Sequence, residues 1–305
     1  MDKIPHIPVL LNEVLEYLSC QDGGTFIDGT FGAGGYTRAI LNASPETKVI
    51  GFDRDPDAVA MGFVVEGQYP HRFSFIHDCF GNMATHLDEP VDGIVLDLGV
   101  SSMQIDTPDR GFSFRFDGPL DMRMGQEGKS AKDYINSLSE KELADILFTY
   151  GEEKASRRIA AAIVREREEH PIISTIQLAN IIHTVMPRPK DGSDSAMRTF
   201  QALRIYVNDE LGELERALDA SVHLLKPGGR LVVVSFHSLE DRLVKNFLIR
   251  NSNAHVHQNR YAPEMKSQAG YFTLLTRKPV VSGEEELVRN PRAHSAKLRA
   301  ARRTV

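Results

Sequence analysis

The part of the sequence best suited to chemistry is a glycine-rich turn between a short apolar run and an acidic residue. Residues 26–36 read Phe-Ile-Asp-Gly-Thr-Phe-Gly-Ala-Gly-Gly-Tyr, and Asp53 lies nineteen residues beyond Gly34. Glycines allow the backbone to approach a ligand closely and to adopt positive φ, and a carboxylate at this distance can bind ribose hydroxyls. The pattern predicts a nucleotide-like ligand, and the alternative is a tight strand-to-helix turn without one.

Two cofactor classes fit this arrangement: nicotinamide dinucleotides and S-adenosylmethionine. A dinucleotide site favours the spacing G-x-G-x-x-G, with a pyrophosphate at a helix N-terminus. Gly32 and Gly34 supply the first two glycines, but Thr37 stands at the third position. S-adenosylmethionine has no pyrophosphate, and it needs mainly backbone contact to its amino-acid end and a carboxylate for its ribose. The Leu-Lys-Pro-Gly-Gly turn at 225–229 is also common in methyltransferases, so the residues favour methyl transfer.

An open sheet would bring these residues together. Short apolar or β-branched runs alternate with helical patterns such as 36–43 and 56–66, which is typical of a parallel sheet with helices on both faces. The expected strands are Thr25–Asp28, Val49–Asp53, Phe73–His77, Gly93–Leu98, Arg230–Phe236 and Tyr271–Arg277. Ligands of such sheets bind beyond the carboxyl ends of the strands. We therefore expect the polar residues that end them, including Asp53, Asp97 and His237, to face one crevice.

The strand rhythm stops between the fourth and fifth expected strands. Helical patterns occupy this stretch instead, at 137–150, 152–169 and 174–185. An amphipathic helix follows at 209–226, and Pro227-Gly228-Gly229 is expected to end it. We therefore expect a discontinuous core of residues 1–106 and 209–305, interrupted by a helical domain at 107–208.

The composition is that of an ordinary globular protein, with 305 residues of which 41% are hydrophobic and 26% charged. Because the net charge is −6, contact with a polyanion would need a local patch. Residues 289–305 hold six arginines and lysines and no acid, which predicts RNA contact, a solvated helix end or a disordered tail. Two cysteines, Cys20 and Cys79, favour a reducing compartment. No apolar run is long enough to span a membrane, and we expect a cytoplasmic protein.

A series of short motifs runs along almost the whole chain. They are His6-Ile-Pro-Val-Leu-Leu-Asn-Glu-Val, Asp28-Gly-Thr-Phe-Gly-Ala-Gly-Gly, Gly51-Phe-Asp-Arg-Asp-Pro, Asp97-Leu-Gly-Val-Ser-Ser, Arg110-Gly-Phe-Ser-Phe, Asp117-Gly-Pro-Leu-Asp-Met-Arg-Met, Tyr150-Gly-Glu-Glu-Lys, Arg198-Thr-Phe-Gln-Ala-Leu-Arg-Ile, Ser235-Phe-His-Ser-Leu-Glu-Asp-Arg and Asn290-Pro-Arg. In this order, the set resembles the bacterial small-subunit ribosomal RNA cytosine-N4 methyltransferases of the MraW (RsmH) type.

The resemblance implies a Rossmann-like class I S-adenosylmethionine-dependent methyltransferase core with an inserted helical substrate domain. It also implies transfer of a methyl group to N4 of a cytidine in the decoding region of small-subunit (16S) ribosomal RNA, with an assembled subunit as substrate and a homodimer as a possible state. The implied cofactor-binding residues are Gly34, Gly35, Tyr36, Asp53, Phe80, Asp97 and Gln104. The family usually has histidine at position 36 and arginine at 294, so Tyr36 and His294 are departures.

Methyl transfer from a sulfonium requires mainly orientation and exclusion of water. The exocyclic N4 of cytosine is a poor nucleophile, and a hydrogen-bond acceptor beside it would help its proton to leave. By position, either Asp97 or the backbone of Ser101 and Ser102 is the expected source of that acceptor. The expected substrate residues in the same motifs are Arg110, Asp117, Arg123 and His237, although each could instead be structural.

Three alternating aromatic residues, Phe112, Phe114 and Phe116, could receive a base that has left its stack or could pack into a core. His255 and His257 form an H-x-H pair without a third clustered ligand, so no metal site is expected. Two rival functions remain open on the residues alone: a methyltransferase acting on another nucleic acid or on a small molecule, and a non-catalytic ribosome-assembly factor with a cofactor pocket.

Overall fold

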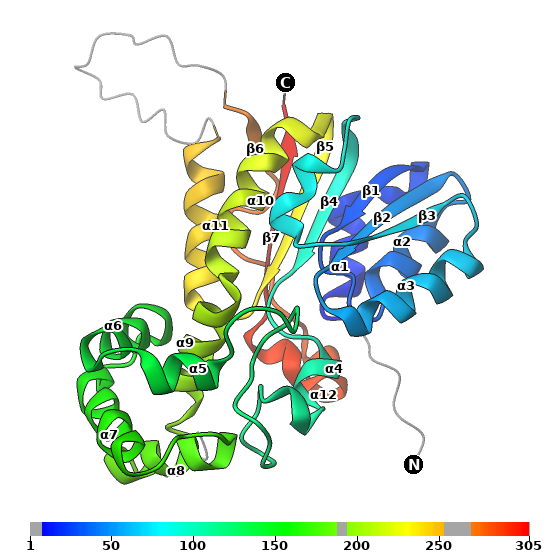
Figure 1. Ribbon diagram of the computed structural model, residues 1–305. Helices are drawn as coiled ribbons and strands as arrows, with labels where there is room; N and C mark the ends of the chain where they lie inside the picture. The colour runs from blue at the N-terminus through cyan, green and yellow to red at the C-terminus, as the bar shows by residue number, and fades with distance from the viewer. Residues whose placement is uncertain (1–7, 188–193, 253–269, 305) are drawn as a thin grey trace, which may run out of the picture. The chain divides into compact units, whose positions relative to one another are not determined.

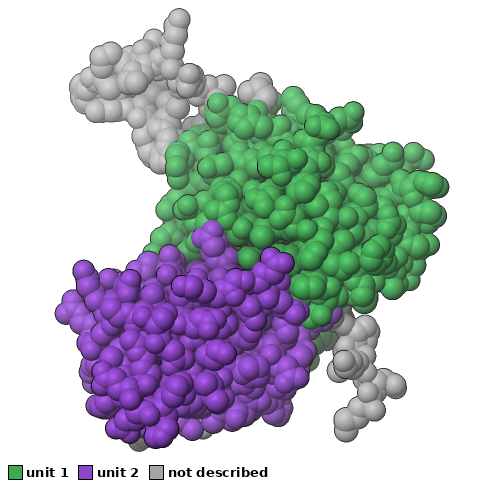
Figure 2. All heavy atoms as spheres, in the orientation of Figure 1, with its two compact units in different colours: residues 1–99, 211–305 green, residues 100–210 purple. Residues whose placement is uncertain are grey.

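The chain folds into two compact units, each with its own hydrophobic core. The computed structural model describes residues 8–187, 194–252 and 270–304. The first unit comprises residues 1–99 and 211–305, and the second comprises residues 100–210 (Figure 2). The stretch at 107–208, where the sequence suggests a helical insertion, falls within the second unit.

The first unit is built on a seven-stranded sheet with the order β3-β2-β1-β4-β5-β7-β6 (Figure 1). Its strands are β1 (Gly24–Asp28), β2 (Thr47–Asp53), β3 (Phe73–His77), β4 (Val91–Asp97), β5 (Leu225–Ser235), β6 (Phe272–Leu274) and β7 (Lys297–Arg303). Strands β1 to β5 pair in parallel, whereas β7 is antiparallel to both of its neighbours. The order 3-2-1-4-5 is that of Rossmann folds. The expected Rossmann-like α/β class is confirmed, with a mixed sheet in place of a wholly parallel one.

Helices cover both faces of this sheet. They are α1 (Leu11–Leu18), α2 (Gly35–Ala43), α3 (Pro56–Gln68), α10 (Glu210–Leu224), α11 (Ser238–Arg250) and α12 (Glu284–Arg289), with 3-10 turns η1 (Cys20–Asp22), η2 (Phe80–Thr85) and η5 (Pro291–Ser295). Successive side chains of a strand point to opposite faces. In β5, Val232 and Val234 therefore enter the core that includes α1 to α3, while Leu231 and Val233 enter the core that includes α10 and α11.

The basic C-terminal stretch differs from the sequence-based expectation. Residues 297–303 form β7 in the middle of the β5-β7-β6 ladder, so this part is neither a helix end nor a disordered tail. Arg299 is buried, and its guanidinium donates to both carboxylate oxygens of Asp241 on α11 at 2.7 and 3.3 Å. The apolar Leu298, Ala300 and Ala301 are fully buried. The arginines in this segment mask the apolar pattern of a strand, so the sequence did not predict β7. Pairing with the distant β5 and β6 stabilises it.

The Pro-Gly-Gly turn also differs from expectation. Helix α10 ends at Leu224, and β5 begins at Leu225, so the turn lies within the strand rather than before it. Leu225 pairs with Val91 and Arg230 pairs with Gly93, which leaves four residues of β5 opposite one residue of β4. Gly228 has a φ of +86°, as a bulge of this kind requires. The turn therefore forms a bulge in the strand.

The second unit is helical, with a core of its own. Its helices are α4 (Ser102–Ile105), α5 (Ala131–Ser137), α6 (Glu140–Gly151), α7 (Ser156–Glu169), α8 (Thr175–Val185) and α9 (Met197–Asn208), with the 3-10 turn η3 (Pro108–Arg110). Ser139 and Glu142 form a capping box at the start of α6. Helix α7 begins at Ser156, later than expected, because α6 extends to Gly151 and the next residue, Glu152, adopts a φ of +48°.

Residues 187–193, whose proline, glycine and serine content predicts a loop, lie almost wholly outside the described residues, as do the first two residues of the His6 motif. Throughout the parts that the structure describes, the helices are too short or too polar to cross a lipid bilayer.

Candidate donor and substrate sites

Three aspartates end neighbouring strands of the first unit at the point where strand order reverses. Asp28 is the last residue of β1, Asp53 of β2 and Asp97 of β4. The sheet places β1 between β2 and β4, and Asp28 pairs in register with Gly51 and Val95. Reversal of strand order leaves a crevice beyond the carboxyl ends of the strands, where ligands of such folds bind.

The glycine turn after β1 is shaped by close backbone approaches. Gly34 caps α2 with a φ of +75°, and a Cβ there would lie 2.9 Å from the Phe31 ring. A Cβ on Gly35 would lie 2.5 Å from Cγ of Pro8. Neither position can hold a larger residue without displacing its neighbour. The Gly34 N–H donates to the Phe31 carbonyl oxygen at 2.7 Å, so the N–H groups that a ligand could reach are those of the first turn of α2, which begins at Gly35.

Asp53 joins this turn to the end of β2. One carboxylate oxygen accepts a hydrogen bond from the Gly32 N–H at 2.7 Å, and the other accepts from the Asp55 N–H at 2.8 Å. Burial raises the pKa of Asp53 from 3.8 to about 6, against the lowering effect of these two bonds. Each oxygen keeps a second lone pair. Asp53 can therefore hold the turn and still accept a hydroxyl from a ligand.

Asp28 has a structural role at the same edge. It is fully buried, and its carboxylate accepts from the Thr37 hydroxyl at 2.7 Å and from the Thr30 N–H at 3.3 Å. Burial raises the pKa of Asp28 to about 6. The Thr30 hydroxyl in turn accepts from the Asp97 N–H at 2.7 Å. Asp28 thus fixes the turn, and through Thr30 the turn fixes the backbone at Asp97.

Asp97 differs from the other two acids. Its Oδ1 is buried and has no hydrogen-bond partner among the described residues. Burial holds the pKa of Asp97 well above its ordinary range, and the nearby charges of Asp28 and Glu240 raise it further. A buried acceptor without a partner is costly and rare in native proteins. This geometry suits a ligand that brings a hydrogen-bond donor or a positive charge.

The other predicted donor residues of the first unit take different positions. Tyr36 is buried in the first turn of α2, and its hydroxyl donates to the carbonyl oxygen of Val9. Burial raises the pKa of Tyr36 well above its ordinary value, and Asp97 and Asp28 add to the shift. Phe80 is half-buried at the start of η2. It packs closely against Gly29, because a Cβ added to that glycine would lie 3.1 Å from the Cβ of Phe80.

His237 lies just beyond β5 and caps helix α11. Its Nδ1 accepts from the Glu240 N–H at 3.5 Å, and its Nε2 lies 3.0 Å from a carboxylate oxygen of Glu240. Glu240 is itself buried and accepts from the Phe236 N–H at 2.8 Å. The structure thus gives His237 a capping role, and its contact with a base stays a prediction.

The remaining predicted site residues belong to the second unit. Ser101 and Gln104 form a reciprocal capping box at the start of α4: the Ser101 hydroxyl accepts from the Gln104 N–H at 3.2 Å, and the Gln104 side-chain oxygen accepts from the Ser101 N–H at 3.0 Å. Ser102 is the first residue of that helix. Part of each polar side chain in the box is therefore committed to local structure.

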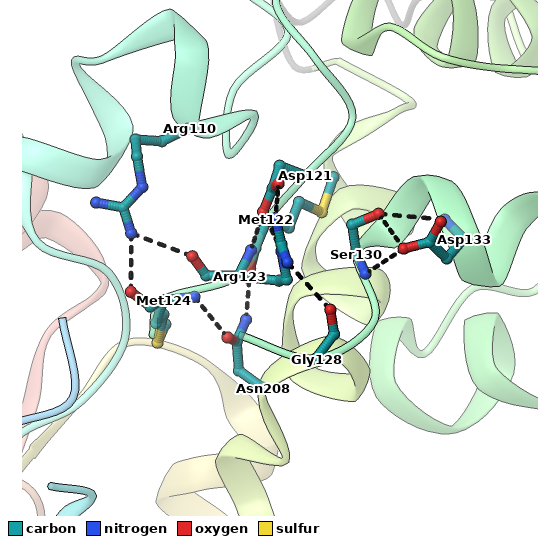
Figure 3. Close-up of polar contacts among 9 residues, drawn as sticks. All are labelled: Arg110, Asp121, Met122, Arg123, Met124, Gly128, Ser130, Asp133 and Asn208. Atoms are coloured by element: carbon teal, nitrogen blue, oxygen red, sulfur yellow. Dashed lines mark hydrogen bonds and ion pairs between the residues drawn. The ribbon is translucent and has the colours of Figure 1, made fainter. Parts of the chain in front are cut away.

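Arg110, Asp121 and Arg123 are bonded into the loop that carries them (Figure 3). Arg110 donates to the carbonyl oxygens of Arg123 and Met124 at 3.1 and 2.9 Å. The Arg123 guanidinium forms a two-point pair with Asp121 at 2.9 and 2.7 Å and donates to Gly128 O at 3.0 Å. These contacts make Arg110 and Arg123 supports of the loop.

Asp117 is also a cap, although it is exposed. Its carboxylate accepts from the backbone N–H groups of Gly118 and Ile176, at 3.1 and 3.3 Å. Hydrogen bonds, first from the Ser174 side chain and then from Ile176, lower the pKa of Asp117. Asp117 therefore joins its loop to the start of α8.

Asn208 is a residue that the sequence analysis missed. It is buried at the end of α9, where its side-chain oxygen accepts from the Met124 N–H at 2.8 Å and its amide group donates to Met122 O at 2.7 Å (Figure 3). Met122 has a φ of +63°. The only sequence signal is an asparagine at the end of an apolar helical pattern, which does not identify its partners.

The three alternating phenylalanines do not share one face. Phe112 is buried, Phe114 packs edge-on against Phe200 with ring centroids 4.7 Å apart, and Phe116 is 67% exposed. Their alternation in the sequence does not place them on one side, because the chain here turns rather than forming a strand. Only Phe116 leaves its ring largely open to solvent. His255 and His257 lie outside the described residues.

The structure thus gathers Gly34, Gly35, Asp53 and Asp97 at one sheet edge of the first unit. Comparison with known proteins identifies the family of the chain. The MraW methylase family matches residues 3–304. The chain is 52% identical over 308 residues to a ribosomal RNA small subunit methyltransferase H of Bradyrhizobium diazoefficiens, covering 100% of this chain and 93% of that relative. It is 54% identical over 310 residues to one of Paramagnetospirillum magneticum, covering 100% and 97%. The resemblance seen in the motifs is confirmed, and the chain belongs to the MraW methylase family.

Proposed function

We propose that this methyltransferase moves a methyl group from S-adenosylmethionine to N4 of one cytidine in the decoding region of small-subunit ribosomal RNA. The main support for a donor site is Oδ1 of Asp97, which is buried beside the glycine turn and has no hydrogen-bond partner among the described residues. The RNA half is supported by the names of relatives that match the chain over its full length. The assembled subunit as substrate, a homodimer and a cytoplasmic location belong to the same proposal.

Bound S-adenosylmethionine supplies an activated methyl group on its sulfonium. In this proposal the backbone of Gly34 and Gly35 faces the methionine end, and Asp53 accepts a ribose hydroxyl while it holds Gly32. Phe80 lies beside the adenine. Asp97 accepts a hydrogen bond either from the donor's ammonium group or from N4 of the target base. The methyl group moves from sulfur to N4 and a proton leaves N4, so orientation is the main contribution of the protein.

Unit 2 is proposed to recognise the RNA. Because Arg110 and Arg123 hold the loop at 110–128, their contribution to RNA binding is to shape that loop. Phe116 offers an open aromatic face of the kind on which an unstacked base can rest. Any direct contact of Asp117 with the substrate would be made by an already engaged side chain.

The test is transfer of a labelled methyl group by the purified protein to three substrates: naked small-subunit RNA, immature small subunits and mature small subunits. We expect label at N4 of a single cytidine, with the assembled particle preferred over naked RNA. Tight donor binding without transfer to any RNA would contradict the enzymatic proposal and favour an assembly factor. Label on DNA or a small molecule instead would contradict the RNA substrate.

A further inference from the structure

A short backbone segment, Pro8–Leu10, packs directly onto the start of α2. All three residues are buried. The Pro8 ring occupies the space that a Cβ on Gly35 would enter, at a distance of 2.5 Å. Leu10 adopts the left-handed conformation, with a φ of +53° and a ψ of +35°, although it is not a glycine. A branched residue held there stores free energy on the order of 1 kcal/mol, and such strain persists only where surrounding contacts enforce it.

Two side chains from distant parts of the chain enforce this conformation. The Tyr36 hydroxyl, from the first turn of α2, donates to the carbonyl oxygen of Val9. A carboxylate oxygen of Glu286, from α12, accepts from the Leu10 N–H at 2.7 Å. The two contacts bind consecutive residues of one segment. Together they fix both the position and the peptide orientation of the backbone around Leu10.

The segment also lies beside the glycine turn of the donor site. The charges that act on the Tyr36 hydroxyl include Asp97 and Asp28, followed by Glu286 and Glu13. Tyr36 directly follows Gly35 in the first turn of α2, so its bond to Val9 joins the segment to the glycine turn. Pro8 contacts the turn at Gly35, where the methionine end of the donor is expected.

We propose that Tyr36 and Glu286 are positioning residues that hold Pro8–Leu10 as a wall of the donor pocket beside the methionine end. This inference rests on the proposed donor site. Neither side chain needs to touch the donor, because each acts through the backbone that it holds. This role also explains why a tyrosine can stand at position 36. Its hydroxyl reaches Val9, while its backbone directly follows the glycine turn.

The test compares two ligands on the full-length protein by calorimetry. S-adenosylmethionine has the amino-acid end, whereas 5′-methylthioadenosine has the adenosine and sulfur without it. Tyr36→Phe and Glu286→Ala should each weaken S-adenosylmethionine binding by roughly five- to tenfold, the equivalent of one hydrogen bond, and should leave 5′-methylthioadenosine binding unchanged. Glu286→Gln keeps an acceptor for Leu10 N–H and should retain most of the affinity.

Matched controls come from the same chain. Tyr69→Phe removes a hydroxyl that donates to Asn42 at 2.9 Å on the surface, and Glu285→Ala removes an exposed acid beside Glu286 on α12. Both should bind both ligands as the wild type does. Equal weakening of the two ligands in Tyr36→Phe and Glu286→Ala would overturn the inference by showing general loosening, and unchanged affinity for both would overturn it too. Failure of the wild type to bind S-adenosylmethionine would instead contradict the proposed function.

Discussion

The two units use the charged residues of their motifs in opposite ways. In the first unit, Asp97 keeps a buried oxygen without a partner among the described residues. In the second unit, Arg110 and Arg123 donate to backbone carbonyls, and Arg123 also pairs with Asp121. Both sets stand in equally specific motifs. The sequence alone does not distinguish them.

The difference shows that the role of a charged motif residue can be inferred from whether its polar atoms already have hydrogen-bond partners. A buried acceptor that lacks a donor destabilises the fold, so its presence indicates a ligand that supplies the donor. A charged side chain that already satisfies backbone groups stabilises a loop, and its removal changes that loop's shape. We therefore expect mutation of Asp97 to change chemistry with little loss of stability, and mutation of the residues that hold the loop of the second unit to do the reverse.

The largest effect is expected from Asp97→Asn. The substitution keeps the shape but removes a charge-bearing acceptor, so single-turnover methyl transfer should slow by about 100-fold or more. The melting temperature of the ligand-free protein should stay the same or rise, because the buried acid has an unmatched oxygen. A strongly lowered melting temperature would break the comparison, since it would make Asp97 a structural residue.

Asn208→Ala tests the second unit, where polar side chains hold the loop in place. Loss of its bonds leaves Met124 N–H and Met122 O unpaired in a buried place, which should lower the free energy of unfolding by about 3 kcal/mol. Affinity for S-adenosylmethionine should change little. Asn180→Ala, an exposed asparagine on α8, is the control and should shift stability by less than about 0.5 kcal/mol. A stable Asn208→Ala protein would show that the loop does not depend on this anchor.

Asp53→Ala should weaken S-adenosylmethionine binding by roughly tenfold, because a ribose hydroxyl loses its acceptor and Gly32 N–H loses its partner. Calorimetry would measure the change. Asp57→Ala, an exposed acid on α3, serves as the control and should bind the donor normally. An unchanged affinity for Asp53→Ala would remove Asp53 from the donor site.

The smallest effect is a pH dependence of stability. The pKa of Asp53 is raised from 3.8 to about 6, so between these values the folded protein holds a proton that the unfolded chain has released. This carboxyl therefore makes the wild type less stable as pH rises through that range. Relative to the wild type, Asp53→Asn should gain stability from pH 4 to 6 and stay level above it. Denaturant unfolding at several pH values would show this, and an opposite slope would mean that the folded site favours the ionised acid.

Local patterns predicted most of the first unit. Strand β3 matches its expected range, and α2 and α3 match within two residues, because apolar runs, capping residues and proline act over a few neighbours. The same local rules failed for β7 and for the bulge in β5. There, strand pairing with distant residues outweighs the preferences of arginine and of Pro-Gly-Gly.

By itself, the sequence determined the family, the sheet-forming runs and the glycine turn, since these depend on residue type and on spacing along the chain. Only the tertiary structure decided which polar groups have partners. Tyr36 bonds 27 residues back to Val9, Arg299 pairs 58 residues away with Asp241, and Asn208 bonds 86 residues away to Met122. Such pairings depend on how the strands and helices assemble. The same assembly leaves Oδ1 of Asp97 without a hydrogen-bond partner among the residues that the structure describes.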